Sequence, residues 1–112
     1  MDCIFCRIAA GEIPSNKLYE DEQVLAFYDI DPKAPVHFLV IPKQHIASAD
    51  ELAAQNSGIV AHVFEVIASV AKTLELQNGY RVVTNVGIDG GQSVSHLHFH
   101  ILGGRALAWP PG

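Results

Sequence analysis

One short run constrains the fold of this 112-residue chain more than any other: histidines alternate with apolar residues in the order HLHFHIL, from residue 96 to residue 102. Successive side chains of an extended strand point to opposite faces of a sheet. A strand over residues 94–102 would therefore place the histidines on one face and the apolar residues on the other. Because imidazole titrates near neutral pH, it can serve as nucleophile, acid, base or metal ligand. The run predicts a functional site at His96, His98 and His100.

The composition favours one globular domain over residues 1–112. Hydrophobic residues make up 49% of the chain and charged residues 17%, which is enough to bury a core. The net charge of -5 argues against a broad surface for nucleic acid or anionic membrane. No apolar stretch approaches the roughly 20 residues of a membrane span, and the start MDCIFC does not resemble a signal peptide. We expect a cytoplasmic protein with no nucleic-acid and no membrane partner.

Periodicity predicts the main elements. Short apolar or β-branched runs that end at turn residues predict strands over 24–28, 36–41, 80–84 and 94–102. Ser48 and Glu51 have the spacing of a capping box, which indicates a short helix. Apolar residues recur at three- and four-residue spacing from Ile59 to Leu74 and predict a long helix. Strands that no helix separates favour antiparallel pairing, so the fold class is α+β, with one sheet face left for chemistry.

The loop before the histidine run indicates what kind of ligand the site takes. Residues 89–93 read DGGQS, and backbone N–H groups of glycine-rich turns can surround an anion. Ser93 adds a hydroxyl group. A pair of glycines alone is also typical of an ordinary turn. Beside three histidines, this loop indicates a phosphate group.

Two cysteines in a C-x-x-C spacing stand at Cys3 and Cys6. Such a pair can be a redox couple, half of a zinc site, or two buried thiols. The redox interpretation is weak, because thioredoxin-like motifs lie between a strand and a helix of a βαβ pattern. The residues themselves leave the zinc site and the plain thiols as open alternatives.

Residues 90–105, GGQSVSHLHFHILGGR, closely resemble the signature of the histidine triad (HIT) family. The resemblance extends over nearly the whole chain, through residues 13–15, 27–30, 34–43 and 109–112. The GGR after the triad and the terminal WPPG resemble the Hint branch rather than the dinucleoside polyphosphate hydrolases. The resemblance implies a mostly antiparallel five-stranded sheet with one long and one short helix, the helices on one side. It also implies a homodimer whose sheet continues across both protomers.

The resemblance further implies an enzyme that cleaves the P–N bond of purine nucleoside 5′-phosphoramidates. The products would be AMP or GMP and an amine, with His98 as the nucleophile and a nucleotidyl-histidine intermediate. His100 would donate to a phosphate oxygen, His37 would support the triad, and no cofactor would be required for catalysis. Substrate contacts are implied at the ribose for Asp29 and Ile30, and near the phosphate or leaving group for Asn85, Gly91, Gln92 and Ser93.

Some prokaryotic family members carry the same cysteine pair and bind zinc with two histidines. The matching positions here are His45 and His96. The resemblance therefore implies a possible structural zinc site formed by Cys3, Cys6, His45 and His96. If zinc binds there, His96 is structural; otherwise it supports His98 in catalysis.

Several alternatives stay open from the sequence. Asp29 precedes Pro32, and an aspartate that starts a turn is a common use of that residue. Four apolar residues could wall a base pocket or belong to the core; these are Phe5, Ile8, Phe27 and Leu39. The activity could instead be hydrolysis of dinucleoside polyphosphates or nucleotidyl adducts. A third hypothesis is a nucleotide-binding or interaction module with low turnover.

Overall fold

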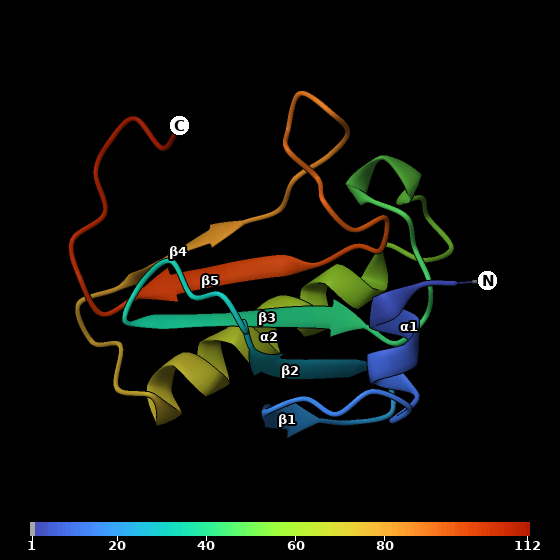
Figure 1. Cartoon of the computed structure of the whole chain (residues 1–112), viewed down its shortest axis with the longest axis horizontal. Coiled ribbons are helices and arrows are strands. Elements are labelled where there is room, and N and C mark those ends of the chain that lie inside the picture. The colour runs from blue at the N-terminus through green and yellow to red at the C-terminus, as the bar shows by residue number, and fades with distance from the viewer. Residues whose placement is uncertain (1) are drawn as a thin grey trace.

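The computed structural model describes residues 2–112, in which five strands form one antiparallel sheet (Figure 1). The spatial order is β1-β2-β3-β5-β4, and every neighbouring pair is antiparallel. The strands are β1 Lys17–Glu20, β2 Val24–Tyr28, β3 Val36–Pro42, β4 Tyr80–Val83 and β5 Phe99–Gly103. The predicted α+β class and five-stranded antiparallel sheet are confirmed.

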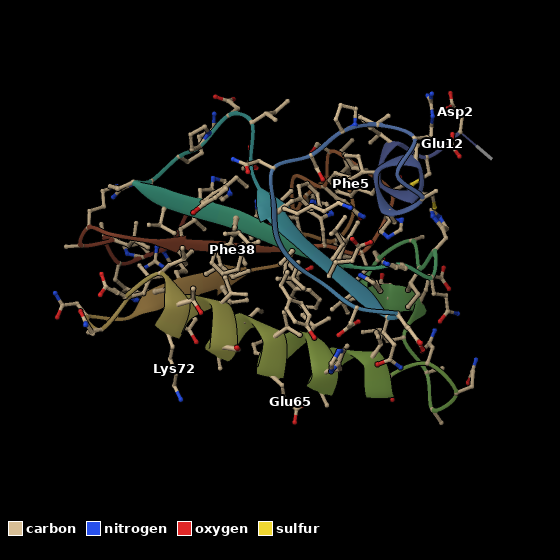
Figure 2. All side chains as sticks on the ribbon, turned by 90° about the horizontal axis from the view of Figure 1, so that it is seen from below. Asp2, Phe5, Glu12, Phe38, Glu65 and Lys72 are labelled. Atoms are coloured by element: carbon tan, nitrogen blue, oxygen red, sulfur yellow. The ribbon has the colours of Figure 1, made fainter. Side chains whose placement is uncertain are left out.

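The long helix α2, Gly58–Thr73, covers one face of the sheet. Its buried side chains recur every three or four residues, so they form one stripe toward the sheet. Figure 2 shows Glu65 and Lys72 pointing away from the sheet on the opposite side of α2. The buried stripe packs with Phe38, Val40 and Ile101 of the sheet in the larger core cluster. The predicted helix is confirmed to within one residue at each end.

The short helix predicted after Ser48 is one turn of 3-10 helix, η1, Ala49–Glu51. The Ser48 hydroxyl accepts a hydrogen bond from the Asp50 backbone N–H at 3.2 Å, as an N-cap does. The predicted start of this element is confirmed, although it does not grow into an α-helix.

A second helix, α1, Ile4–Ala9, packs against the face of the sheet opposite α2 (Figure 2). Phe5 and Ile8 are buried there with Leu25, Leu39 and Ile41 in a separate core cluster. The expectation that the helices lie on one side of the sheet is therefore wrong for α1. Only Phe5 and Ile8 are buried among its six residues, which is too short a pattern to predict a helix.

Strand β1 is the other element that the apolar pattern did not predict. Its residues are mostly exposed, and its register with β2 shifts between Lys17 and Tyr19. This four-residue edge strand buries only Leu18, and only in part, so it is too short to show the alternation that marks a strand.

The histidine strand is shorter than predicted, because β5 begins at Phe99 and residues 94–98 are irregular. The pairing with β3 ends at Val40 opposite Phe99. Continuing this register would place Pro42 opposite Leu97, but Pro42 has no N–H to donate. The Leu97 N–H instead donates to the Ile46 carbonyl at 2.6 Å. Nevertheless, Leu97 and Phe99 enter the core under α2, so the predicted separation of apolar residues from histidines holds.

Among residues 2–112, no helix combines the length and the hydropathy that a bilayer span requires.

Candidate active site and metal centre

The strand register brings His37 and His100 together on the face opposite α2. His37 of β3 lies opposite Leu102, and Leu39 lies opposite His100 of β5. His37 and His100 are therefore diagonal neighbours on one face, a spacing that long side chains can bridge. The His37 Nε2 and His100 Nδ1 atoms lie 3.0 Å apart.

Hydrogen bonds determine which nitrogen of His37 and of His100 carries the proton. The Lys33 backbone N–H donates to His37 Nδ1 at 3.0 Å, so the proton of neutral His37 is on Nε2. His37 Nε2–H then donates to His100 Nδ1, which places the His100 proton on Nε2. This chain of hydrogen bonds leaves His100 Nε2–H as a donor for a ligand.

The protonation of both rings agrees with this chain. Burial lowers the pKa of His37, although the nearby Asp29 opposes the shift. Burial also lowers the pKa of His100 to about 4, and the neighbouring His98 and His37 act in the same direction. Both rings are therefore neutral near pH 7. The series of hydrogen bonds requires this, because each ring must offer one nitrogen as an acceptor.

Asp29 follows β2 and uses its two carboxylate oxygens differently. Oδ1 accepts the Asp31 backbone N–H at 2.8 Å, which is the contact of a turn-starting aspartate. Oδ2 lies 3.4 Å from His37 Nε2 and 4.0 Å from His100 Nδ1. The turn role is thus shown, and the second oxygen lies beside the histidines.

His98 is buried and held in one tautomer by the chain's own backbone. Its Nδ1 lies 2.6 Å from the His96 carbonyl oxygen. Since a carbonyl can only accept, Nδ1 carries the proton and Nε2 carries the lone pair. The His98 ring is 5.0 Å from the His100 ring and 5.0 Å from the Phe5 ring, in edge-to-face contacts. This is the arrangement that a nucleophilic imidazole needs, with an adjacent N–H donor.

A groove of about 330 Å³ lies beside the His37–His100 pair, and the buried His98 is not among the residues that line it. Asp29, His37, Asn85 and His100 line it, so the structure brings four predicted site residues to one cavity. Ile30, which was predicted at the ribose, is fully exposed beside Asp29.

The glycine-rich loop is braced from within. The Gln92 side chain accepts from the Gly87 N–H at 3.1 Å and donates to the Ala47 and Val94 carbonyls at 2.7 and 3.0 Å. A Cβ atom on Gly90 would lie 2.4 Å from the Val86 carbonyl oxygen, and Gly91 has a φ of +75°. These contacts explain structurally why the loop has glycines at positions 90 and 91 and glutamine at position 92. The contacts of Gly91 and Gln92 with a phosphate stay predictions.

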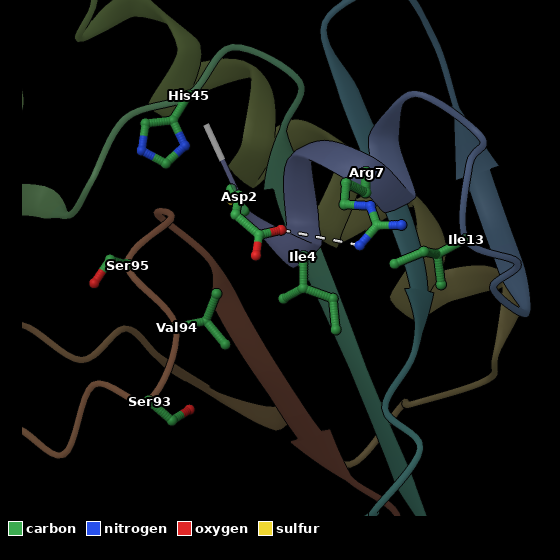
Figure 3. Close-up of a pocket in the computed structure, with 9 residues that line it drawn as sticks. Asp2, Ile4, Arg7, Ile13, His45, Ser93, Val94 and Ser95 are labelled. Atoms are coloured by element: carbon green, nitrogen blue, oxygen red, sulfur yellow. Dashed lines mark ion pairs between the residues drawn. The ribbon is translucent and has the colours of Figure 1, made fainter.

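Ser93 lines a second hollow of about 600 Å³ between α1 and the segment before β5 (Figure 3). Figure 3 shows Ser93, Val94 and Ser95 on one side of this hollow. Across it lies Arg7, which pairs with Asp2 at 3.9 Å. Ser93 is exposed, so its hydroxyl is accessible to a ligand.

The four residues of the predicted zinc site meet beside this hollow, which two of them, Cys3 and His45, line. His96 Nδ1 lies 3.4 Å from Cys3 Sγ, 3.5 Å from Cys6 Sγ and 3.2 Å from His45 Nδ1. Cys6 Sγ lies 3.3 Å from His45 Nδ1, and all four atoms are within 4.8 Å of one another. We call these four residues the Cys-His cluster.

The donors of the Cys-His cluster fit a tetrahedral zinc ion. Zn–S bonds of about 2.3 Å and Zn–N bonds of about 2.0–2.1 Å place neighbouring ligand atoms roughly 3.3–3.8 Å apart. His96 Nε2 lies 2.8 Å from the Pro42 carbonyl oxygen, so it carries the proton and leaves the Nδ1 lone pair facing the cluster. Two cysteines and two histidines form a closed, structural donor set.

Asp29, His37 and His100 also bring three potential ligand atoms together. Here the tautomers oppose metal binding, because His37 Nε2 carries a proton while Nδ1 accepts from Lys33. These three residues are joined by hydrogen bonds, whereas the Cys-His cluster presents lone pairs to one point.

Sequence reasoning missed two groups that hold the site. The Lys33 backbone N–H orients His37, and Thr84 Oγ1 donates to the His98 carbonyl at 2.9 Å. A backbone contact leaves no sequence signal, and Thr84 was recognised only as the end of a strand. The four apolar residues considered for a base pocket are buried in the α1 core cluster: Phe5, Ile8, Phe27 and Leu39.

A five-stranded antiparallel sheet that carries adjoining histidines on one face defines the histidine triad class. The chain belongs to this family: the HIT domain model matches residues 10–107. An uncharacterised HIT-like protein of Synechococcus elongatus is 50% identical over 99% of this chain and 97% of its own length.

Solved structures support the same assignment. A HIT family hydrolase from Legionella pneumophila matches with a TM-score of 0.97 and 46% identity, over 99% of this chain and 100% of that one. A histidine triad protein from Clostridium difficile matches with a TM-score of 0.94 and 53% identity, over 96% and 95% of the chains. A histidine triad nucleotide-binding protein from Candida albicans has a TM-score of 0.82 and 35% identity, over 97% and 83%.

Proposed function

We propose that this protein is a Hint-like nucleotide hydrolase that cleaves the P–N bond of purine nucleoside 5′-phosphoramidates. The observation that carries the proposal is the 2.6 Å contact between His98 Nδ1 and the His96 carbonyl, which leaves the His98 Nε2 lone pair for attack. Descriptions of similar proteins as a hydrolase and as nucleotide-binding agree with it.

In the proposed reaction, His98 Nε2 attacks the α-phosphorus and the bond to the amine breaks. The amine leaves with a proton from solvent, and a nucleotidyl-histidine remains. Water then attacks the phosphorus, releases AMP or GMP and regenerates His98. Covalent catalysis of this kind divides one difficult displacement into two easier ones. His100 Nε2–H stabilises the charge on the phosphate oxygens during both steps.

The remaining predicted residues surround this chemistry. Asp29 and Ile30 bind the ribose, and Asn85, Gly91, Gln92 and Ser93 contact the phosphate or the leaving amine. The protein acts as a homodimer; because β4 is an edge of the sheet, a second copy can extend the sheet there. No cofactor takes part in the bonds that form and break, and a zinc ion in the Cys-His cluster would have a structural role.

The proposal is tested by incubating the purified protein with adenosine 5′-phosphoramidate and, separately, with diadenosine tetraphosphate. We expect AMP to be released from the phosphoramidate at least about tenfold faster, measured as kcat/KM by chromatography. Faster cleavage of the tetraphosphate would favour the polyphosphate hydrolase instead. Tight AMP binding with no turnover of either compound would indicate a nucleotide-binding module.

Replacing Asp29 tests the ribose contact. We expect Asp29→Ala to raise KM for adenosine phosphoramidate by about tenfold, because a charge-assisted hydrogen bond is worth roughly 1.5–3 kcal/mol. Asp29→Asn, which can still accept the Asp31 N–H, is the matched control for the turn. With the 2′-deoxy substrate, we expect the difference in KM between wild type and Asp29→Ala to disappear. Equal sensitivity of both substrates would remove Asp29 from the ribose site.

A further inference from the structure

The proposed nucleophile lies just outside the regular sheet. The ladder between β3 and β5 begins at Phe99, so it does not fix the backbone of His98. Other contacts hold this segment: the Leu97 N–H donates to the Ile46 carbonyl at 2.6 Å, and Thr84 Oγ1 donates to the His98 carbonyl at 2.9 Å. The His98 ring itself depends on the His96 carbonyl. The orientation of His98 therefore depends on where residue 96 is held.

Both nitrogens of the His96 ring are engaged, and they point to different parts of the fold. Nε2–H donates to the Pro42 carbonyl at the end of β3. Nδ1 faces Cys3 Sγ at 3.4 Å and His45 Nδ1 at 3.2 Å. A cation bound in the Cys-His cluster would fix this fully buried ring from the second side. It would thereby fix the residue whose carbonyl orients His98.

The other ligands of the Cys-His cluster also connect to the nucleophile. Cys3 and Cys6 flank Phe5, whose ring contacts the His96 ring at 5.9 Å and the His98 ring at 5.0 Å. His45 directly precedes Ile46, the residue that accepts the Leu97 N–H. Contacts from all four ligands thus converge on residues 96–98.

We propose that metal binding in the Cys-His cluster positions the nucleophile of the active site. With a zinc ion held by Cys3, Cys6, His45 and His96, the His96 ring would be fixed, so that its carbonyl keeps accepting the His98 Nδ1–H and the Nε2 lone pair stays available to substrate. The metal takes no part in bond making. Cys3, Cys6, His45 and His96 are accordingly positioning residues. This inference rests on the proposed function insofar as it concerns turnover, but the orientation of His98 can be measured without substrate.

The experiment compares zinc-loaded wild type, chelator-stripped wild type and the variant His45→Asn. His45 is half-buried and lies outside α1 and the sheet, so this variant disturbs the fold less than loss of a cysteine. His62→Asn is the matched control: it removes an imidazole that contacts Asp21 at 2.6 Å and belongs to neither cluster. Elemental analysis measures zinc, steady-state kinetics measure kcat and KM, and nitrogen–proton NMR of the histidine rings follows the His98 Nδ1–H.

We expect wild type and His62→Asn to carry zinc and a sharp His98 Nδ1–H signal. Stripped wild type and His45→Asn should lose that signal. Their kcat should fall by about tenfold or more, as it does when a contact that orients a reacting group is removed. Their KM should change by less than about twofold. Added zinc should restore stripped wild type but not His45→Asn.

Three results would overturn the inference. The first is wild-type protein that binds no zinc. The second is stripped protein that keeps both the His98 Nδ1–H signal and its kcat. Unfolding of both zinc-free forms would show that the metal supports the whole fold rather than the nucleophile. A failure of the proposed function would give a different result. No form of the protein would hydrolyse the phosphoramidate, while the His98 Nδ1–H signal would still report whether zinc positions the ring.

Discussion

Replacing His98 by alanine is expected to lower kcat/KM for adenosine phosphoramidate by about 10⁴-fold or more, the scale on which enzymes lose rate with their nucleophile. His98 is the residue whose Nε2 carries a lone pair beside the His100 donor, because its Nδ1–H is committed to the His96 carbonyl at 2.6 Å. Hydrogen bonds and binding contacts around the groove remain in the variant and account for residual rate. The fold should persist, since residues 94–98 lie outside the ladder.

His62→Ala is the control for this variant, because it also removes an imidazole but contacts Asp21 at a distance from the groove. It should retain turnover within about twofold. Circular dichroism and a thermal melt establish that His98→Ala is folded. Turnover above about a tenth of wild type in folded His98→Ala would contradict its role as nucleophile.

The largest effect on stability is expected from Phe38→Ala, at about 3–5 kcal/mol of the free energy of unfolding. Phe38 is 0% exposed and lies in β3 within the core between the sheet and α2. Its removal leaves a cavity that strands on both sides keep open. Such a loss approaches the total stability of a domain of this size. Urea unfolding followed by circular dichroism measures it.

Phe64→Ala is the matched control, since Phe64 is 46% exposed on α2. It removes the same atoms from a half-solvated position, where it touches the Phe99 ring at 5.7 Å. We expect a loss below about 1.5 kcal/mol, because much of that ring stays in water. Equal losses for the two variants would contradict the packing of the core around Phe38.

Elements with a regular apolar pattern could be predicted from the sequence. The stripe on α2 and the strands β2, β3 and β4 agree with their predicted ranges to within about one residue. α1 and β1 could not, because a six-residue helix and an exposed edge strand bury too few residues to show a period. The early end of the histidine strand follows from Pro42, a residue of another strand, and no local pattern reveals such a partner.

The candidate site was predictable as residue types but not as geometry. The run from His96 to His100 and the cysteine pair were visible, and resemblance supplied His37 and His45. Their meeting depends on strand register, which pairs Leu39 with His100 and so brings His37 within 3.0 Å of it. The tautomers depend on backbone groups of Lys33 and His96, which any residue could supply.

The central claim is that His98 forms a covalent nucleotidyl intermediate, and rapid quenching of the reaction followed by peptide mapping tests it most directly. Wild type mixed with adenosine phosphoramidate for milliseconds, then denatured at alkaline pH and digested, should yield the peptide containing residues 96–100 with one adenylyl group on His98. His98→Ala should yield none. An adenylyl group on another residue of wild type, or turnover that never labels the protein under these conditions, would contradict the mechanism.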